Sequence, residues 1–405
     1  MSGLITYEEA LARLTADIAP LDAETVALTE ACGRTLAEPV VATRAQPPEA
    51  LSAMDGYAVR SDDVAAPGAR LSVIGEAPAG GVFEDAVGAG EAVRIFTGAP
   101  VPRGADRVVM QENVVREDDA AVIGEAQTGP SFVRPAGLDF AAGERLLEPG
   151  RRLSAIDIGV AAAANYGVLP VHRRPRIAIF ATGDELVEPG EAKSDRDIVN
   201  SAAYAVSALV TSWGGAPEVR GVLPDDLDAT VEALGAAAAE ADVLLTIGGA
   251  SVGEHDLVKP AAARIGAAFR FEKVAVKPGK PVWHGRVPEG PLLLGLPGNP
   301  ASAIACALLF LHPLIGALLG GDATGPEFRA ARLSVDLPAN GDRESFLRGR
   351  AFLQDGALSV CADDRQDSSL LTPFAAANAL IRRAPDAPAA KAGAPIDVLM
   401  FGPTD

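Results

Sequence analysis

The spacing of apolar residues changes several times along the chain, and each change predicts a different kind of structure. Residues 4–18 carry leucine and isoleucine at helical spacing, with Thr6 and Glu9 in the pattern of a capping box. A second helical pattern runs from Ser154 to Tyr166 and ends at Gly167. Between them, glycine, proline and aspartate separate short β-like runs, which predict strands at Tyr57–Arg60, Leu71–Gly75, Ala92–Phe96, Arg107–Met110 and Ala121–Ile123.

These patterns predict that one domain is inserted into another. We expect a β-rich domain over residues 44–147, placed between the two halves of a discontinuous helical linker domain. The linker domain consists of residues 1–43 and 148–174, and its two helices are expected to pack together.

From residue 175 apolar strands alternate with helices. Such alternation predicts parallel strands joined by crossover helices, which is a doubly wound α/β domain. We assign this domain to residues 175–326 and residues 327–405 to a C-terminal β domain, so that the fold class is multidomain α/β. The expected α/β strands are Ile177–Ala181, Glu218–Leu223, Val243–Ile247 and Leu292–Leu296, and the expected helices are Ser201–Trp213, Asp226–Ala239 and Ala301–Leu319. The expected C-terminal strands are Ala331–Leu337, Phe346–Phe352 and Leu358–Cys361.

The apolar stretch Ala301–Gly320 is long enough to be weighed as a membrane span. His312 and Pro313 interrupt it, and a turn motif opens it. We therefore expect a buried helix in a globular core rather than a helix that crosses a bilayer.

The net charge of the chain limits the kinds of molecule that it is expected to bind. The chain has 35 Lys and Arg against 54 Asp and Glu, a formal net charge of −19, so long-range attraction to nucleic acid or to an anionic membrane is not expected. An anionic substrate would need basic residues gathered locally at its site. The cysteines (Cys32, Cys306 and Cys361) are widely scattered, which favours reduced, buried thiols over disulfides or a metal cluster. Residues 1–10 lack a signal-peptide pattern. The expected location is cytoplasmic.

Glycine-rich turns follow three of the expected α/β strands. Because ligands bind beyond the carboxyl ends of strands in such sheets, the turns are expected to meet at one edge. Glycine lets backbone N–H groups approach a phosphate, and Asn299 with Pro300 is suited to begin the next helix. One such turn alone is ordinary turn chemistry, but three favour an anion or nucleotide site. The candidate binding residues are Thr182, Gly183, Asp184, Gly248, Gly249, Ser251, Pro297, Gly298, Asn299 and Pro300.

Lys273, Lys277 and Lys280 form a basic cluster in an acidic chain. The even spacing of Lys273 and Lys277 predicts that both point from one face of a strand. A solvated basic edge strand is the alternative, but the neighbouring glycine turns favour anion binding.

Carboxylates flank many of the turns, and hard oxygen ligands of this kind suit Mg²⁺ beside a phosphate site. For each one alone, a turn or helix-cap role is the alternative. The histidines show no metal-ligand spacing, and no arrangement for nucleophilic catalysis emerges. The candidate carboxylates are Asp55, Asp139, Glu185, Asp225, Asp226 and Asp256.

Six ordered motifs along nearly the whole chain resemble those of the molybdopterin molybdenumtransferase family, the molybdenum insertases that include MoeA and the gephyrin E domain. Ser52–Arg60 and Arg94–Asp106 resemble signatures of the family's inserted β domain. The signatures of its α/β domain are matched by Thr182–Leu186, Gly248–Asp256, Lys277–Pro281 and Leu296–Pro300.

The resemblance implies a homodimer whose active site combines the α/β domain of one subunit with the β domain of the other. It implies Mg²⁺-assisted insertion of molybdate into adenylylated molybdopterin, with release of AMP. By position, Glu185 and Asp256, with Asp225 or Asp226, would hold metal and adenylate. Molybdate would be received by Lys273 and Lys277, with Pro297 and Pro300 shaping the pocket. The partner's β domain would supply Asp55, Thr97, Arg134 and Asp139.

Some positions depart from the family pattern. Leu138 and Ile198 stand where the family has acidic residues, which bears on metal coordination. Two other functions stay open: a molybdopterin adenylyltransferase, which shares the α/β domain, and a scaffold that binds molybdopterin without catalysis. That adenylyltransferase and chaperones of molybdoenzymes are the candidate protein partners.

Overall fold

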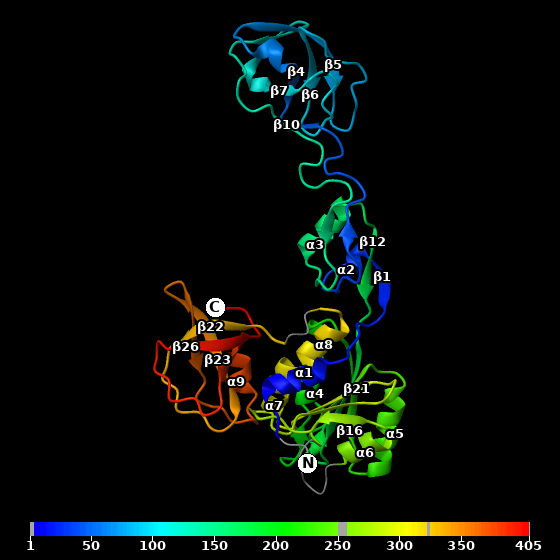
Figure 1. The fold of residues 1–405 in the computed structure, drawn as a ribbon, viewed down its shortest axis with the longest axis vertical. Helices are drawn as coiled ribbons and strands as arrows, with labels where there is room; N and C mark the ends of the chain where they lie inside the picture. Colours follow the sequence, from blue (N-terminus) through cyan, green and yellow to red (C-terminus); the bar gives the residue numbers. More distant parts are fainter. Residues whose placement is uncertain (1–3, 250–256, 322–324, 405) are drawn as a thin grey trace.

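The computed structural model describes residues 4–249, 257–321 and 325–404. The described chain is elongated, with a β domain at one end, a narrow linker in the middle, and the α/β and C-terminal domains side by side at the other end (Figure 1). The predicted multidomain α/β architecture is confirmed.

The inserted domain is built on a six-stranded sheet with two apolar clusters as its core. Five of its strands lie where the sequence predicts them, and β8 was not predicted. Short 3₁₀ helices, η1 (Ser61–Val64) and η2 (Gln111–Asn113), lie in its connections, and a pair, β3 (Leu51–Ser52) with β10 (Val133–Arg134), lies beside the sheet. The strand order is β7 (Arg107–Met110), β4 (Gly56–Val59), β6 (Glu91–Ile95), β5 (Ala69–Ala77), β9 (Ala120–Ile123) and β8 (Val114–Glu117).

The linker carries the chain out to the β domain and back. Its outgoing and returning segments pair antiparallel, β1 (Ala23–Ala27) with β12 (Val168–His172) and β2 (Val40–Val41) with β11 (Arg145–Leu147). The helices α2 (Leu28–Ala31) and α3 (Ala155–Ala163) complete it, and Ser154 with Asp157 forms a capping box on α3.

The N-terminal helix packs differently from the prediction. Thr6 caps α1 (Tyr7–Thr15) by accepting from the backbone N–H of Glu9 at 3.1 Å, as the capping pattern predicts. Its buried face, however, belongs to the core of the α/β domain, where Tyr7, Ala10 and Leu14 are buried. The expected packing of this helix against α3 is therefore wrong. Its apolar stripe is filled by the α/β domain instead.

The α/β domain has a six-stranded mixed sheet. Its first four strands are parallel, as predicted, whereas β18 and β20 form an antiparallel edge that the sequence did not reveal. The strand order is β16 (Ala216–Leu223), β13 (Arg176–Thr182), β17 (Val243–Ile247), β21 (Leu292–Leu296), β20 (Trp283–Arg286) and β18 (Ala268–Phe271). A small parallel pair, β14 (Leu186–Val187) with β15 (Ile198–Val199), follows β13.

Helices cover both faces of this sheet. One face packs against α4 (Ala202–Ser212) and the long apolar helix, and the other against α5 (Leu227–Ala238) and α6 (Val258–Arg264). The long helix runs through α7 (Pro300–Cys306), a π-helical segment η3 (Ala307–Leu311) and α8 (His312–Leu318). The wider π turn accommodates Pro313, which lacks the backbone N–H of a regular helical bond.

The long helix is a core helix. The helix Pro300–Leu318 is long and apolar enough to cross a membrane, but 83% of its most apolar 18-residue stretch is buried inside the protein. The expected burial of this helix is confirmed. Its cysteine, Cys306, is buried as predicted, but Cys32 is exposed and Cys361 is half-buried, so the expectation of buried thiols is wrong for those two.

The C-terminal domain closes its strands into a ring. Three strands lie near the predicted ones: β22 (Phe328–Leu333), β23 (Glu344–Gln354) and β24 (Ala357–Ala362). The strands β25 (Ala379–Arg383) and β26 (Pro395–Met400) were not predicted, and α9 (Thr372–Ala376) lies between β24 and β25 in the chain. Strand β23 pairs with both β24 and β25, which completes the ring. It also pairs with β19 (Val276–Lys277), so a strand from the α/β domain joins the C-terminal sheet.

Candidate active site

The three glycine turns meet at one edge of the α/β sheet. They follow the neighbouring parallel strands β13, β17 and β21. The N–H of Gly248 donates to the carbonyl of Leu296 at 3.0 Å, and a Cβ on Gly248 would lie 2.4 Å from the Thr182 hydroxyl oxygen. A Cβ on Gly298 would lie 3.3 Å from the Cα of Gly248. Glycine is therefore required for the turns to approach one another so closely, and their backbone groups converge where a ligand is expected.

The first turn folds back over itself. Gly183 has a positive φ of 137°, and a Cβ there would lie 2.7 Å from Oε1 of Glu185. Asp184 and Glu185 are exposed at this edge. In the second turn, Gly249 has a φ of 58° and packs against Val258. The predicted site residues Ser251 and Asp256 lie outside the described residues.

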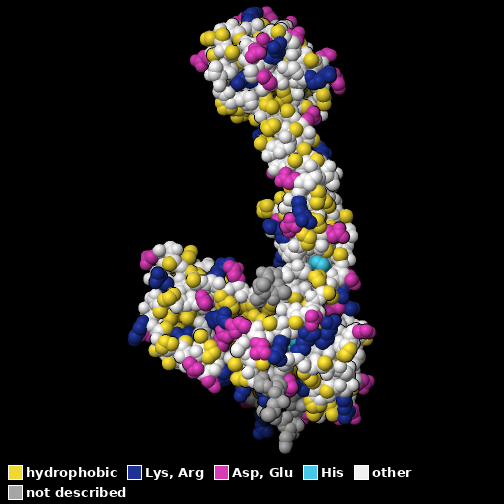
Figure 2. All heavy atoms as spheres, in the orientation of Figure 1, with side chains coloured by type: hydrophobic (Ala, Val, Ile, Leu, Met, Phe, Trp, Pro, Cys, Tyr) yellow, Lys and Arg dark blue, Asp and Glu magenta, His cyan; other side chains and the backbone are white. Residues whose placement is uncertain are grey.

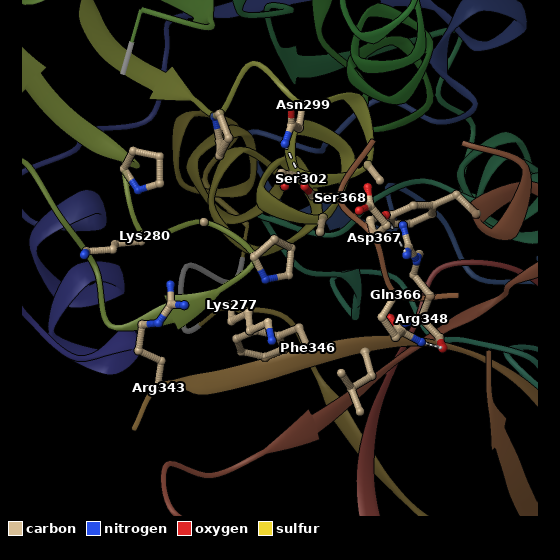
Figure 3. Close-up of a pocket in the computed structure, with 18 residues that line it drawn as sticks. Lys277, Lys280, Asn299, Ser302, Arg343, Phe346, Arg348, Gln366, Asp367 and Ser368 are labelled. Carbon is tan, nitrogen blue, oxygen red and sulfur yellow. Dashed lines mark hydrogen bonds between the residues drawn. The ribbon is translucent and has the colours of Figure 1, made fainter. Parts of the chain in front are cut away.

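The third turn begins α7 with help from the C-terminal domain. Pro300 occupies the first turn of the helix, as expected, but Asn299 makes no side-chain cap bond of its own. Instead, Nδ2 of Asn299 donates to Oγ of Ser368 at 2.6 Å, and the backbone N–H of Ala301 donates to the carbonyl of Ser368 at 3.1 Å (Figure 3). Asn299 thus occupies the N-cap position, as predicted, but its side chain does not form the expected capping bond. A loop of the C-terminal domain supplies the acceptor.

A cavity of about 630 Å³ lies between the α/β and C-terminal domains. Lys277, Lys280 and Pro297 line it from the α/β domain, and Arg343 and Arg348 line it from the C-terminal domain (Figure 3). Both lysines are exposed, and Nη1 of Arg343 donates to the carbonyl of Val276 at 3.2 Å. The lining therefore holds four cationic side chains against one carboxylate, Asp367, in a chain whose net charge is −19. Elsewhere, on the face in Figure 2, acidic and basic side chains are interspersed.

The lysines do not share a strand as predicted. Lys273 lies beyond the end of β18 and outside the lining of this cavity, and only Val276 and Lys277 form β19. Lys280 lies in the turn that follows. Pro278 and Pro281 cannot donate to a strand ladder, and the short β19 pairs with β23 rather than with β18. The expected common face of Lys273 and Lys277 is therefore wrong.

Arg348 is the buried cation of this cavity, with a relative exposure of 4%. Its guanidinium donates to the carbonyls of Arg365, Asp367 and Leu370 at 2.6, 2.9 and 3.1 Å. Its Nε has no hydrogen-bond partner within the described chain. Burial lowers the pKa of Arg348, because its charge is desolvated. All three acceptors are neutral carbonyls, whereas the nearby carboxylates of Asp363 and Asp367 raise the pKa of Arg348 and partly offset its charge. The remaining positive charge would attract an anion in the cavity.

Arg343, Arg348 and Ser368 were not predicted as site residues. Arg343 directly precedes β23 and Arg348 lies within it, and basic residues in such positions are common on exposed strands. Only the pairing of β19 with β23 brings them to Lys277, and no local sequence signal reveals that pairing.

The second group of predicted residues lies in the β domain. The backbone N–H and the hydroxyl of Thr97 each donate to Oδ1 of Asp55 at 2.8 Å. These bonds, the backbone one first, hold the pKa of Asp55 below its usual value. Arg134 and Asp139 are exposed in the same domain. Within one chain the β domain lies at the opposite end of the molecule from the α/β domain, so one chain does not bring Asp55 to Lys277 (Figure 1).

The remaining carboxylates that the structure describes do not form a metal centre by themselves. Asp226 caps α5, accepting from the N–H of Ala229 at 2.8 Å, and Asp225 is exposed beside it. Among the described residues, no three Asp, Glu, His or Cys side chains lie close enough together to hold a metal ion. Metal binding by Glu185, Asp225, Asp226 and Asp256 stays a prediction.

Family models match nearly the whole chain. The model of the MoeA N-terminal region (domains I and II) matches residues 5–165. That of the probable molybdopterin binding domain matches residues 178–317, and that of the MoeA C-terminal region (domain IV) matches residues 330–401.

Individual proteins agree with these matches. The molybdopterin molybdenumtransferase of a Nostoc species is 39% identical over 368 residues, which cover 89% of this chain and 84% of that protein. That of Haemophilus influenzae is 32% identical over 382 residues, 93% of this chain and 94% of that protein. The crystal structure of the molybdopterin biosynthesis moeA protein from Pyrococcus horikoshii superimposes with a TM-score of 0.84 at 29% identity, covering 98% of this chain and 100% of that one.

Proposed function

Because the chain belongs to the molybdopterin molybdenumtransferase family and is a transferase of molybdenum cofactor biosynthesis, we propose that it inserts molybdate into adenylylated molybdopterin and releases AMP. The observation that carries this proposal is the cationic cavity beside the three converging glycine turns. The cavity and the turns would then provide two neighbouring anion sites, as a reaction between two anions requires.

In this proposal molybdate occupies the cavity. Molybdate is a tetrahedral dianion, so Lys277 and Lys280 would donate to its oxygens from the α/β domain and Arg343 from the C-terminal domain. Arg348 contributes its charge from the buried wall. Preorganised cations of this kind offset the repulsion between molybdate and a phosphate-bearing partner.

The pterin substrate would bind across the sheet edge. Backbone N–H groups in the turns at Gly183, Gly248 and Gly298, apart from that of Gly248 itself, which is bonded to Leu296, would hold its pyrophosphate, because glycine allows the backbone to approach phosphate oxygens. Thr182 and Asn299 would border this subsite. The dithiolene would then face the cavity in which molybdate is held, so that binding alone brings the reacting groups together.

Mg²⁺ fits the chemistry of this edge. Glu185 is exposed there, and Mg²⁺ is commonly held by one or two carboxylates together with substrate phosphates. Asp256 is the second candidate ligand. Asp226 already caps α5 with one carboxylate oxygen, so its part in metal binding would be through the other. Bound Mg²⁺ would polarise the phosphoanhydride and so favour the departure of AMP.

We also propose that the active protein is a homodimer. Asp55, Thr97, Arg134 and Asp139 would reach the α/β domain of the partner chain, which resolves their distance from the lysines within one chain. The reaction would take place in the cytoplasm, with an adenylyltransferase supplying the adenylylated pterin and molybdoenzyme chaperones receiving the product.

One assay tests this function. Purified protein is incubated with adenylylated molybdopterin, Mg²⁺ and molybdate, and both AMP and molybdenum cofactor are quantified. We expect AMP release that depends on molybdate. Adenylate transfer from ATP to molybdopterin would indicate an adenylyltransferase instead, and tight pterin binding without AMP release would indicate a scaffold.

A further inference from the structure

Arg94 lies beside Asp55 in the β domain and has no role in the proposed reaction so far. It is in β6, three residues before Thr97, and its guanidinium reaches the turn that carries Asp55. Nη1 of Arg94 donates to the carbonyl of Gly56 at 3.1 Å, and Nη2 donates to Oε1 of Gln111 at 2.6 Å. The backbone N–H of Gln111 in turn donates to the carbonyl of Asp55 at 3.1 Å. Arg94 therefore holds the backbone at Gly56, directly after Asp55. It also holds the side chain of Gln111, whose backbone N–H binds the Asp55 carbonyl.

Two aromatic rings hold the Arg94 guanidinium in place. Its central carbon lies 5.1 Å from the ring centroid of Tyr57 and 4.9 Å from that of Phe96. Tyr57 is its direct neighbour across the antiparallel pair of β4 and β6. Cation–π contacts with both rings restrict the side chain to the orientation that serves Gly56 and Gln111.

The charge of Arg94 is not neutralised by its hydrogen bonds. Its acceptors are a backbone carbonyl and an amide oxygen, and within the described residues it forms no ion pair with a carboxylate. Beside it, Asp55 receives both bonds from Thr97 on one oxygen, Oδ1. After those bonds, the nearby charge of Arg94 also lowers the pKa of Asp55.

We infer that Arg94 is a positioning residue for Asp55: it holds the turn so that the second carboxylate oxygen, Oδ2, is presented to the partner subunit's substrate. The inference rests on the proposed function, in which Asp55 completes the site. Thr97 fixes one end of the carboxylate and Arg94 fixes the backbone from which it extends, so the loss of either would let Oδ2 move. A displacement of about 1 Å at a reacting group can lower a rate by about 100-fold.

The test compares substitutions that separate charge, hydrogen bonding and packing. Arg94→Met keeps an extended apolar chain between the rings but removes the charge and both hydrogen bonds. Arg94→Lys keeps the charge and one donor group. Arg70→Met is the matched control, because Arg70 lies near the start of β5 in the same sheet, opposite Val122 of β9, and forms an exposed ion pair with Glu117. Single-turnover AMP release, the KM for molybdate and thermal unfolding are measured for each full-length variant.

Arg94→Met is expected to lower the rate of AMP release by roughly 10- to 100-fold, with the KM for molybdate unchanged. Arg94→Lys should recover part of that rate, and Arg70→Met should match the wild type. When Asp55→Asn is already present, adding Arg94→Met should lower the rate of AMP release little further, because the effects of residues that act through one another are not additive.

A wild-type rate of AMP release in Arg94→Met would overturn the inference. It would also be overturned if the rate losses of Arg94→Met and Asp55→Asn simply multiplied in the double variant. If Arg94→Met does not fold, Arg94→Lys decides: a folded lysine variant with the full wild-type rate overturns the inference, and one with a reduced rate and unchanged KM supports it. A wild-type protein that releases no AMP would refute the proposed function itself, which is a different result.

Discussion

Replacing Lys277 with alanine should weaken the use of molybdate without unfolding the protein. The side chain is exposed in the cavity, whereas its backbone pairs with Ser345 between β19 and β23 and is kept in the variant. Little packing is lost, so the free energy of unfolding should change by less than about 0.5 kcal/mol. The effect is therefore expected in the interaction with the anion.

The size of the effect follows from charge and exposure. Two unit charges 4 Å apart interact by about 4 kcal/mol at the effective dielectric constant of about 20 found near protein surfaces, and by about 1 kcal/mol in bulk water. Lys277 is exposed, and Lys280, Arg343 and Arg348 remain in the variant, so the lower part of this range applies. A loss of about 1–2 kcal/mol corresponds to a 5- to 30-fold increase in the KM for molybdate.

Initial rates of AMP release at varied molybdate concentration measure this directly. Lys391→Ala is the matched control, because Lys391 is 85% exposed and pairs with Asp336 away from the cavity. Added salt should raise the KM of the wild type more steeply than that of Lys277→Ala, since one screened attraction is missing from the variant. An unchanged KM in Lys277→Ala, with the control also unchanged, would remove Lys277 from the molybdate site.

Three further predictions address the metal, the dimer and the fold. Glu185→Gln should raise the Mg²⁺ concentration for half-maximal AMP release by about tenfold, and an identical Mg²⁺ titration would show that Glu185 is not a ligand. At a molybdate concentration well below the wild-type KM, where Lys277→Ala is least active, mixed Asp55→Ala and Lys277→Ala proteins should reach about a quarter of wild-type activity after random subunit exchange, because half of the dimers then carry one intact site. No gain over the activities of the separate proteins after verified exchange would place the site within one chain. Burial lowers the pKa of His284 from 6.5 to about 4, so the unfolded chain binds this proton first as pH falls, and stability is lost between pH 6.5 and 4. Between pH 7 and 5 the free energy of unfolding, measured with urea, should fall by about 2 kcal/mol less in His284→Gln than in the wild type. An equal fall in both proteins would contradict this prediction.

The sequence predicted the parallel part of the α/β sheet well for a physical reason. Strands buried on both faces are continuous apolar runs, and the observed bounds of β17 and β21 are those predicted. Strand β20 contains His284, Gly285 and Arg286, which carry no such signal, so the antiparallel edge was missed. The packing of α1 was missed as well, because an apolar stripe shows that a helix is covered but not which domain covers it.

The site was predictable only where chain topology determines it. Turns after neighbouring parallel strands must lie at one edge, so the meeting of Thr182, Gly248 and Gly298 followed from the strand pattern. The contribution of the C-terminal domain depends on contacts between residues far apart in sequence. Ser368 reaches Asn299 across 69 positions, and such contacts have no local pattern.

Those contacts make the C-terminal domain part of the site rather than an accessory to it. The pairing of Val276 with Glu344, the bond from Arg343 to the carbonyl of Val276, and the bond from Ala301 to the carbonyl of Ser368 join the two domains around the cavity. A chain with a net charge of −19 repels a dianion at long range, but ions screen that repulsion beyond about 8 Å at physiological ionic strength. Inside the cavity the nearby cations act over shorter distances and dominate. Capture of molybdate therefore depends on keeping cations from both domains within reach of one anion, and the backbone links between the domains keep them there.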